Sequence, residues 1–146
     1  MVRWSLESFI NSTIARGEIS RADVNSLRRD VLPNGIEGRD EADVLIALDR
    51  AIFDKDGDWA PFLIQAVVDF VVWSSRPTGR VDRNAAEWLA SSLGCGSGPT
   101  RNAVAIAFEV IREAESTHEA LVTIVMRWRA RESAVLAHGR APELVF

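Results

Sequence analysis

The stretch GEISR, residues 17–21, decides the fold, because the chain repeats its pattern as GRVDR at residues 79–83. In both copies a glycine precedes an apolar residue, and a residue able to cap a helix then precedes an arginine. The repeat continues where DEADVLIALDRA, residues 40–51, is matched by NAVAIAFEVIREA, residues 102–114. A repeat of this length indicates helical units that bury their apolar faces against one another.

Helix signals occur along most of the chain, and strand signals are nearly absent. Ser20 and Asp23 have the spacing of a capping box, and Asp82 is placed to cap the matching helix of the second copy. No segment alternates apolar and polar residues for long enough to form a regular strand. The only extended pair that we expect joins residues 18–19 to residues 36–37. The sequence therefore predicts an all-α fold of about seven helices.

The repeat and the composition predict one domain. With 146 residues, 47% of them hydrophobic, the chain can bury a single good core. We expect a single helical domain over residues 1–146, in which two pseudo-repeated, EF-hand-like helix-pair units pack around a central apolar helix. The expected ranges are about 10–53 for repeat one, 59–75 for the central helix, about 79–115 for repeat two and 116–137 for a C-terminal helix.

The central helix is predicted from WAPFLIQAVVDFVVW, residues 59–73, which is apolar nearly all round. This segment is shorter than the roughly 20 residues that cross a bilayer, so we expect a buried helix and no membrane insertion. Asp69 lies between Val68 and Phe70 on this helix. We expect its carboxylate to be buried unless it lies on a groove, and a buried carboxylate needs a partner such as an arginine or a helix N-terminus.

Charge and cysteine content exclude several classes of protein. The net charge is −4, and the acidic excess lies in the range 1–60, which holds 12 acidic against 8 basic side chains. An acidic balance argues against a nucleic-acid-binding surface, which needs a basic face. Cys95 is the only cysteine, so the chain cannot form an internal disulfide. No N-terminal stretch has the pattern of a signal peptide, so a cytoplasmic protein is expected.

The glycine-centred loops between the helices invite comparison with the calcium loops of EF-hands. Only the loop around Gly35 keeps three oxygen-bearing side chains at ligand positions, namely Asp30, Asn34 and Glu41. Leu32 occupies loop position three, where an EF-hand has a further oxygen ligand. The spacing predicts at most weak binding of Ca²⁺ or another divalent cation there, with a purely structural turn as the alternative. No other cofactor is expected.

The doubled pattern of Gly-x-[Ile/Val] before a helix, then a second glycine loop before a more acidic helix, resembles the TerB-like proteins of tellurite resistance. It is closer still to uncharacterised proteobacterial proteins that carry degenerate tandem EF-hand-like units. The resemblance covers roughly residues 10–125. It implies an all-helical fold, a link to stress response, contacts with metal ions and protein partners, and no catalytic centre.

These patterns favour a non-enzymatic helical protein-interaction module, and the resemblance to TerB-like proteins implies an association with stress response. Its unknown protein partner would bind a groove or the acidic surface of the first repeat. The alternative is a divalent-metal sensor with one degenerate EF-hand-like loop. An enzyme is not expected, because no nucleophile with a base, phosphate-binding loop or metal triad is visible in the sequence. We expect a monomer or a small homo-oligomer.

Overall fold

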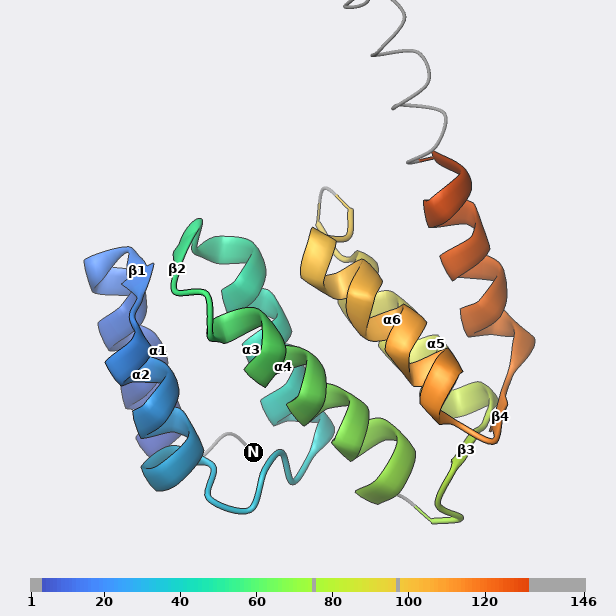
Figure 1. Ribbon diagram of the computed structural model, residues 1–146, viewed down its shortest axis with the longest axis horizontal. Coiled ribbons are helices and arrows are strands. Elements are labelled where there is room, and N and C mark those ends of the chain that lie inside the picture. The colour runs from blue at the N-terminus through green and yellow to red at the C-terminus, as the bar shows by residue number, and fades with distance from the viewer. Residues whose placement is uncertain (1–3, 75, 97, 132–146) are drawn as a thin grey trace, which may run out of the picture.

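The computed structural model describes residues 4–74, 76–96 and 98–131. Within these residues the fold is all-α, with seven helices and only two-residue strands, as the sequence predicts (Figure 1). The π-helical turns η1 (Leu27–Val31) and η2 (Asp69–Ser74) continue the helices α2 (Arg21–Ser26) and α4 (Trp59–Val68). The elements in chain order are α1 (Trp4–Arg16), β1 (Glu18–Ile19), α2 (Arg21–Ser26), η1 (Leu27–Val31), α3 (Arg39–Ala51), β2 (Asp54–Lys55), α4 (Trp59–Val68), η2 (Asp69–Ser74), β3 (Arg80–Val81), α5 (Arg83–Gly94), α6 (Arg101–Glu113), β4 (Ser116–Thr117) and a last helix over residues 119–131.

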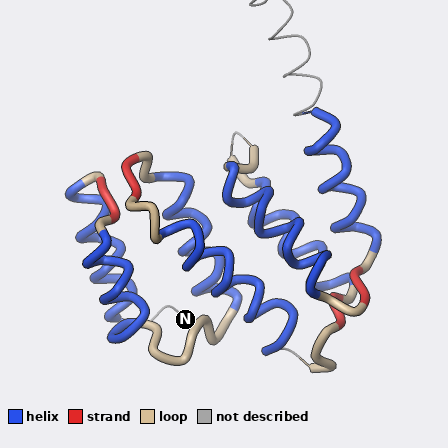
Figure 2. The backbone as a smooth tube through the Cα atoms, in the orientation of Figure 1, coloured by secondary structure: helices blue, strands red, loops and turns tan. Residues whose placement is uncertain are grey.

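Several elements begin at the spacing of the sequence repeat. The starts of β1 and β3, of α2 and α5, of α3 and α6, and of β2 and β4 are each separated by the same offset as Gly17 and Gly79. In each half the two strands pair in parallel, β1 with β2 and β3 with β4 (Figure 2). The predicted pairing of residues 18–19 with residues 36–37 is therefore wrong. That the two halves superpose about a pseudo-twofold axis stays a prediction.

Glycine opens both strand pairs because the backbone there takes a left-handed conformation. The φ angle is 75° at Gly17 and 81° at Gly79, a region that strains residues with a Cβ atom. At Gly79 a Cβ would also lie only 2.7 Å from the Oε2 atom of Glu115. The glycine that starts each copy of the repeat is therefore required by the turn.

The predicted caps are confirmed on the helices that follow these turns. The backbone N–H of Asp23 donates to Ser20 Oγ (3.2 Å), and that of Ser20 donates to the Asp23 carboxylate (2.9 Å). In the second half, Ala85 N–H donates to Asp82 Oδ1 (2.9 Å). Both caps satisfy N–H groups that a helix start leaves without partners.

One hydrophobic cluster runs through both halves of the described chain. Leu27 and its repeat counterpart Leu89 are both fully buried, as the apolar stripes predict. Helix α4 contacts α2, α3 and, most extensively, α6, and it buries Trp59 and Leu63 completely. The apolar segment in the middle of the chain thus links elements of the first half to α6 in the second.

The expectation for Asp69 is wrong, because its side chain is exposed and accepts a hydrogen bond from Gln65 Nε2 at 2.8 Å. Residues four apart share one face of a helix. Pro61, Gln65, Asp69 and Trp73 are all exposed at this spacing, so they form a solvent-facing stripe on α4 and η2. The helix is amphipathic, and its two internal polar residues mark the outer face.

The last helix starts later than predicted. It begins at residue 119 rather than 116, because Ser116 and Thr117 form β4 and pair with β3. Its predicted end at residue 137 lies outside the described residues. Among the helices that the structure describes, none has both the length and the apolar character needed to cross a membrane.

Candidate functional site

The residues predicted to hold a cation take different positions in the fold. Asp30 on η1 and Asn34 in the following turn are exposed, whereas Glu41 on α3 is 4% exposed. Glu41 Oε1 accepts the backbone N–H of Glu37 at 2.8 Å, so this carboxylate fixes the loop that leads into α3. Within residues 4–74, 76–96 and 98–131 there is no group of three or more potential metal-ligating side chains. A cation site at this loop stays a prediction.

The most exposed large apolar side chain that the structure describes is Phe53, which is 98% exposed just before β2. Two exposed acidic residues lie beside it, because Glu18 of β1 is the direct partner of Asp54 of β2 in the parallel pairing. We call Glu18, Phe53 and Asp54 the Phe53 corner. An almost fully exposed aromatic residue is therefore followed directly in the chain by an exposed acidic residue that is paired with a second one.

The backbone of the Phe53 corner is anchored on both sides of the phenyl ring. On one side Ile52 is buried, and its N–H donates to the carbonyl oxygen of Leu48 (3.0 Å). On the other side Asp56 N–H donates to the carbonyl oxygen of Ile19 on β1 (2.8 Å). Phe53 is therefore exposed on an ordered segment.

Lys55 connects the Phe53 corner to a buried residue of α3. Its Nζ donates to the backbone oxygen of Asp49 (2.8 Å) and to Asp49 Oδ1 (3.0 Å). Asp49 lies on α3 and is only 2% exposed. Lys55 thus turns inward from β2, while the two residues before it face solvent.

Asp49 is the centre of a buried network that sequence reasoning missed. Besides Lys55, its carboxylate accepts hydrogen bonds from Trp59 Nε1 (2.9 Å), Asn102 Nδ2 (2.8 Å) and Thr100 Oγ1 (2.7 Å). Thr100 and Asn102 belong to the start of α6, so the network joins the two halves of the chain. The sequence did contain a signal for the burial of Asp49, because this residue lies at helical spacing between the apolar residues Leu45 and Ile52.

The network decides the ionisation state of Asp49. Burial disfavours the charged carboxylate, but hydrogen bonds from Thr100, Asn102, Trp59 and Lys55 outweigh it and hold the pKa of Asp49 below its ordinary value. If the carboxylate were removed, Trp59, Thr100 and Asn102 would lose their acceptor, and Lys55 would keep only the backbone oxygen of residue 49. Asp49 is therefore a structural anion rather than a group available for proton transfer.

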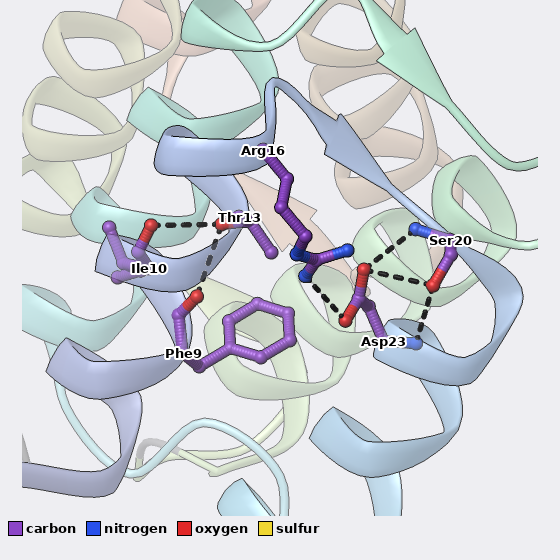
Figure 3. Close-up of polar contacts among 6 residues, drawn as sticks. All are labelled: Phe9, Ile10, Thr13, Arg16, Ser20 and Asp23. Atoms are coloured by element: carbon purple, nitrogen blue, oxygen red, sulfur yellow. Dashed lines mark hydrogen bonds and ion pairs between the residues drawn. The ribbon is translucent and has the colours of Figure 1, made fainter.

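A second salt bridge fixes the start of β1 (Figure 3). Arg16 at the end of α1 donates to Asp23 Oδ1 at 2.9 Å, across the strand that carries Glu18. The hydrogen bond to the Asp23 side chain raises the pKa of Arg16, against a smaller effect of burial, and the charge of Glu18 adds to this. The guanidinium is thus committed to the capping box, and Glu18 remains exposed beside Asp54.

The second half supplies an internal comparison, because it has the same strand pairing with different side chains. At the offset of the repeat, the counterparts of Glu18, Phe53 and Asp54 are Arg80, Glu115 and Ser116. Arg80 is paired with Ser116 in the register, so β3–β4 has neither the neighbouring acids nor the exposed ring. The turn geometry therefore does not require a phenylalanine at position 53.

Three other polar residues that could have a functional role lie outside the Phe53 corner. Cys95 is an exposed free thiol in the connection between α5 and α6. Asp69 pairs with Gln65 on the outer face of α4 and η2. His118, for which the sequence predicts no specific role, lies at the start of the last helix and contacts its first turn.

No protein-family model, curated protein or solved structure matches this chain. The likeness of its repeat pattern to TerB-like proteins stays a prediction. The function must therefore be inferred from the residues of the chain, and the Phe53 corner carries the most exposed large apolar side chain that the structure describes.

Proposed function

We propose that this protein is a non-enzymatic helical protein-interaction module that binds a protein partner through the Phe53 corner. The observation that carries the proposal is the 98% exposure of Phe53 on an anchored segment. Burying a phenylalanine side chain fully stabilises by about 1.5–3 kcal/mol, and the free protein gains none of this at position 53. Because the backbone is already held by Ile52 and Lys55, binding needs little further ordering.

The acidic side chains of the corner indicate the chemistry of the partner. Glu18 and Asp54 are direct partners in the parallel strand pairing, and their like charges repel each other. A partner with an apolar pocket rimmed by lysine or arginine would bury Phe53 and relieve this repulsion. The acidic excess over residues 1–60 would also accelerate the encounter with such a partner. The link to stress response implied by the TerB resemblance belongs to this proposal.

Phe53→Ala tests the proposal, with Met126→Ala as the matched control. Met126 is also an exposed apolar residue, at 64%, but it lies on the last helix outside the corner. The wild type and both variants are immobilised and exposed to an extract of the native host, and bound proteins are quantified by mass spectrometry. We expect one or more proteins to be retained by the wild type and by Met126→Ala and lost from Phe53→Ala.

The partner found in this way is then purified and titrated by calorimetry. We expect Phe53→Ala to weaken binding at least about tenfold, as expected for a central aromatic contact, and Met126→Ala to change it less than about twofold. Neither change should alter the free energy of unfolding by more than about 0.5 kcal/mol, since both side chains are exposed. If every interaction of the wild type survives Phe53→Ala, the corner is not the binding surface.

A further inference from the structure

We propose that α6 and the last helix, residues 119–131, form a second docking surface, which binds an acidic amphipathic helix of a partner protein. Two large apolar side chains are exposed here, Phe108 on α6 at 41% and Met126 on the last helix at 64%. Arg129 shares one face of the last helix with Met126, and its guanidinium lies 5.0 Å from the centre of the Phe108 ring. We call Phe108, Met126 and Arg129 the Met126 face.

The last helix is the counterpart of α4, because the two helix starts are related by the offset of the repeat and make equivalent hydrogen bonds. Trp59 N–H donates to the carbonyl oxygen of Asp56 (3.0 Å). At the same offset, Leu121 N–H donates to the carbonyl oxygen of His118 (3.1 Å). Trp59 and Leu121 are both fully buried. Positions on the two helices can therefore be compared directly.

The comparison shows that the Met126 face corresponds to a covered surface of the first half. The counterpart of Phe108 is Ile46 on α3, which is only 3% exposed. The counterpart of Met126 is Ile64 on α4, which is half-buried. In the first half, α3 is contacted by α5, and α4 is contacted most extensively by α6. The second half therefore presents as open surface two apolar positions that are packed in the first.

Helix α6 shows which kind of segment covers such a surface. It packs on α4, and its buried residues lie on one face at helical spacing, namely Ala103, Ile106, Ala107 and Val110. A segment that covers the Met126 face in the same way is an amphipathic helix with apolar residues at positions i, i+3, i+4 and i+7.

The charge of the last helix indicates that this partner helix is acidic. Arg129 occupies the position at which α4 has Val67, which is fully buried. From residue 120 to residue 131 the helix carries Arg127, Arg129 and Arg131 and no acidic residue. Among the described residues, none of these three arginines forms an ion pair with a carboxylate. Carboxylates beside the apolar stripe of a partner helix would complement these cations.

The charge of the whole chain favours a short acidic helix over a larger polyanion. The net charge is −4, so a nucleic acid or an anionic membrane would be repelled by the rest of the protein. A helix of a few turns needs only the local complement. The last helix and β2, which follows Phe53, lie on opposite sides of the fold, with α4 and α6 between them (Figure 1). The Met126 face and the Phe53 corner can therefore be occupied independently.

A displayed library of helical peptides tests the proposal on the full chain. Each peptide has leucine at positions i, i+3, i+4 and i+7, and its flanking positions vary among glutamate, glutamine and lysine. The library is selected on the wild type, and the enriched peptides are synthesised and titrated by fluorescence anisotropy. The test variants are Met126→Ala and Arg129→Glu. Ile14→Ala is the matched control, because Ile14 is 54% exposed on α1, outside the Met126 face.

We expect the enriched peptides to be rich in glutamate and to bind Met126→Ala and Arg129→Glu at least about tenfold more weakly than the wild type. Ile14→Ala should bind them within about twofold of the wild type. Selection on Arg129→Glu should enrich lysine at one or more positions where the wild type enriches glutamate. The proposal is overturned if the wild type enriches no peptide, if glutamate is not preferred, or if both test variants bind as the wild type does. It is also overturned if sedimentation velocity shows a wild-type dimer that Met126→Ala dissociates, since a second copy would then cover the face.

Discussion

At the scale of single residues, we expect the replacement of Asp49 to have a large effect on the free energy of unfolding. Replacing it with alanine leaves three donors without their acceptor, namely the side-chain groups of Trp59, Thr100 and Asn102, and it leaves Lys55 with only the backbone oxygen of residue 49. We expect Asp49→Ala to lower the free energy of unfolding by about 3 kcal/mol or more. Asp54→Ala, on the exposed side of β2, should change it by less than about 0.5 kcal/mol.

Urea denaturation followed by tryptophan fluorescence measures both variants. A loss below about 1 kcal/mol for Asp49→Ala would show that water replaces the network without cost. Because Lys55 anchors the Phe53 corner through Asp49, the same variant should also weaken partner binding without any change at the surface itself.

The lowered pKa of Asp49 predicts how its contribution depends on pH. Since the folded protein binds this proton more weakly than the unfolded chain, the stabilisation is complete above the unfolded pKa of about 3.9. It declines as the pH falls through the lower pKa of the folded state. The difference in unfolding free energy between the wild type and Asp49→Asn should therefore be largest above about pH 5 and shrink toward pH 3. Urea titrations at several pH values measure it, and a constant difference would contradict the assignment.

Asp49 and Asp69 show what sequence reasoning can and cannot find at this scale. The apolar sequence neighbours of Asp69 predict burial, but Gln65 lies one turn away and marks a polar face. Asp49 has basic residues nearby in the sequence, yet it lies on the apolar stripe between Leu45 and Ile52. The helical spacing, rather than the adjacent residues, predicts burial. The donors from residues 100 and 102 could not be predicted, because they are distant in sequence.

At the scale of elements, the caps were predictable and the strand partners were not. A capping box such as that of Ser20 and Asp23 acts within one helical turn, so its signal is local. The strands have only two residues each and pair in parallel across a long stretch of intervening helical chain, so no periodic pattern marks them. The same limit explains the late start of the last helix, because β4 occupies the first two residues of the range predicted for that helix.

The loop around Gly35 illustrates a local pattern with two possible outcomes. Its spacing resembles a cation-binding loop, and Glu41 engages a backbone N–H of the same loop. Such a bond serves a turn equally well without an ion, because it gives an acceptor to the backbone N–H of Glu37, just before α3 begins. The residue spacing therefore identified a loop in which Glu41 holds the backbone. Whether this loop also binds a cation depends on the exposed residues Asp30 and Asn34.

At the scale of the whole molecule, polar contacts join the two halves at several points. Asp49 on α3 accepts hydrogen bonds from the start of α6. Arg39 donates to Asn84 Oδ1 (2.7 Å), and Trp88 Nε1 donates to Asp43 Oδ1 (2.9 Å), so α3 is also tied to α5. Together with the continuous hydrophobic cluster, these contacts make independent folding of either half unfavourable.

The whole chain should therefore unfold in one cooperative transition, and a core truncation in either half should destabilise all of it. Leu27 and Leu89 occupy equivalent positions in the repeat, and both are fully buried. We expect Leu27→Ala and Leu89→Ala each to cost about 2–5 kcal/mol and to shift the transition as a whole. Circular dichroism and tryptophan fluorescence, recorded along one urea titration, should give coincident curves for the wild type and both variants. Two separate transitions, with each variant moving only the one that belongs to its own half, would show that the halves are independent units and that the contacts of Asp49 with α6 do not couple them.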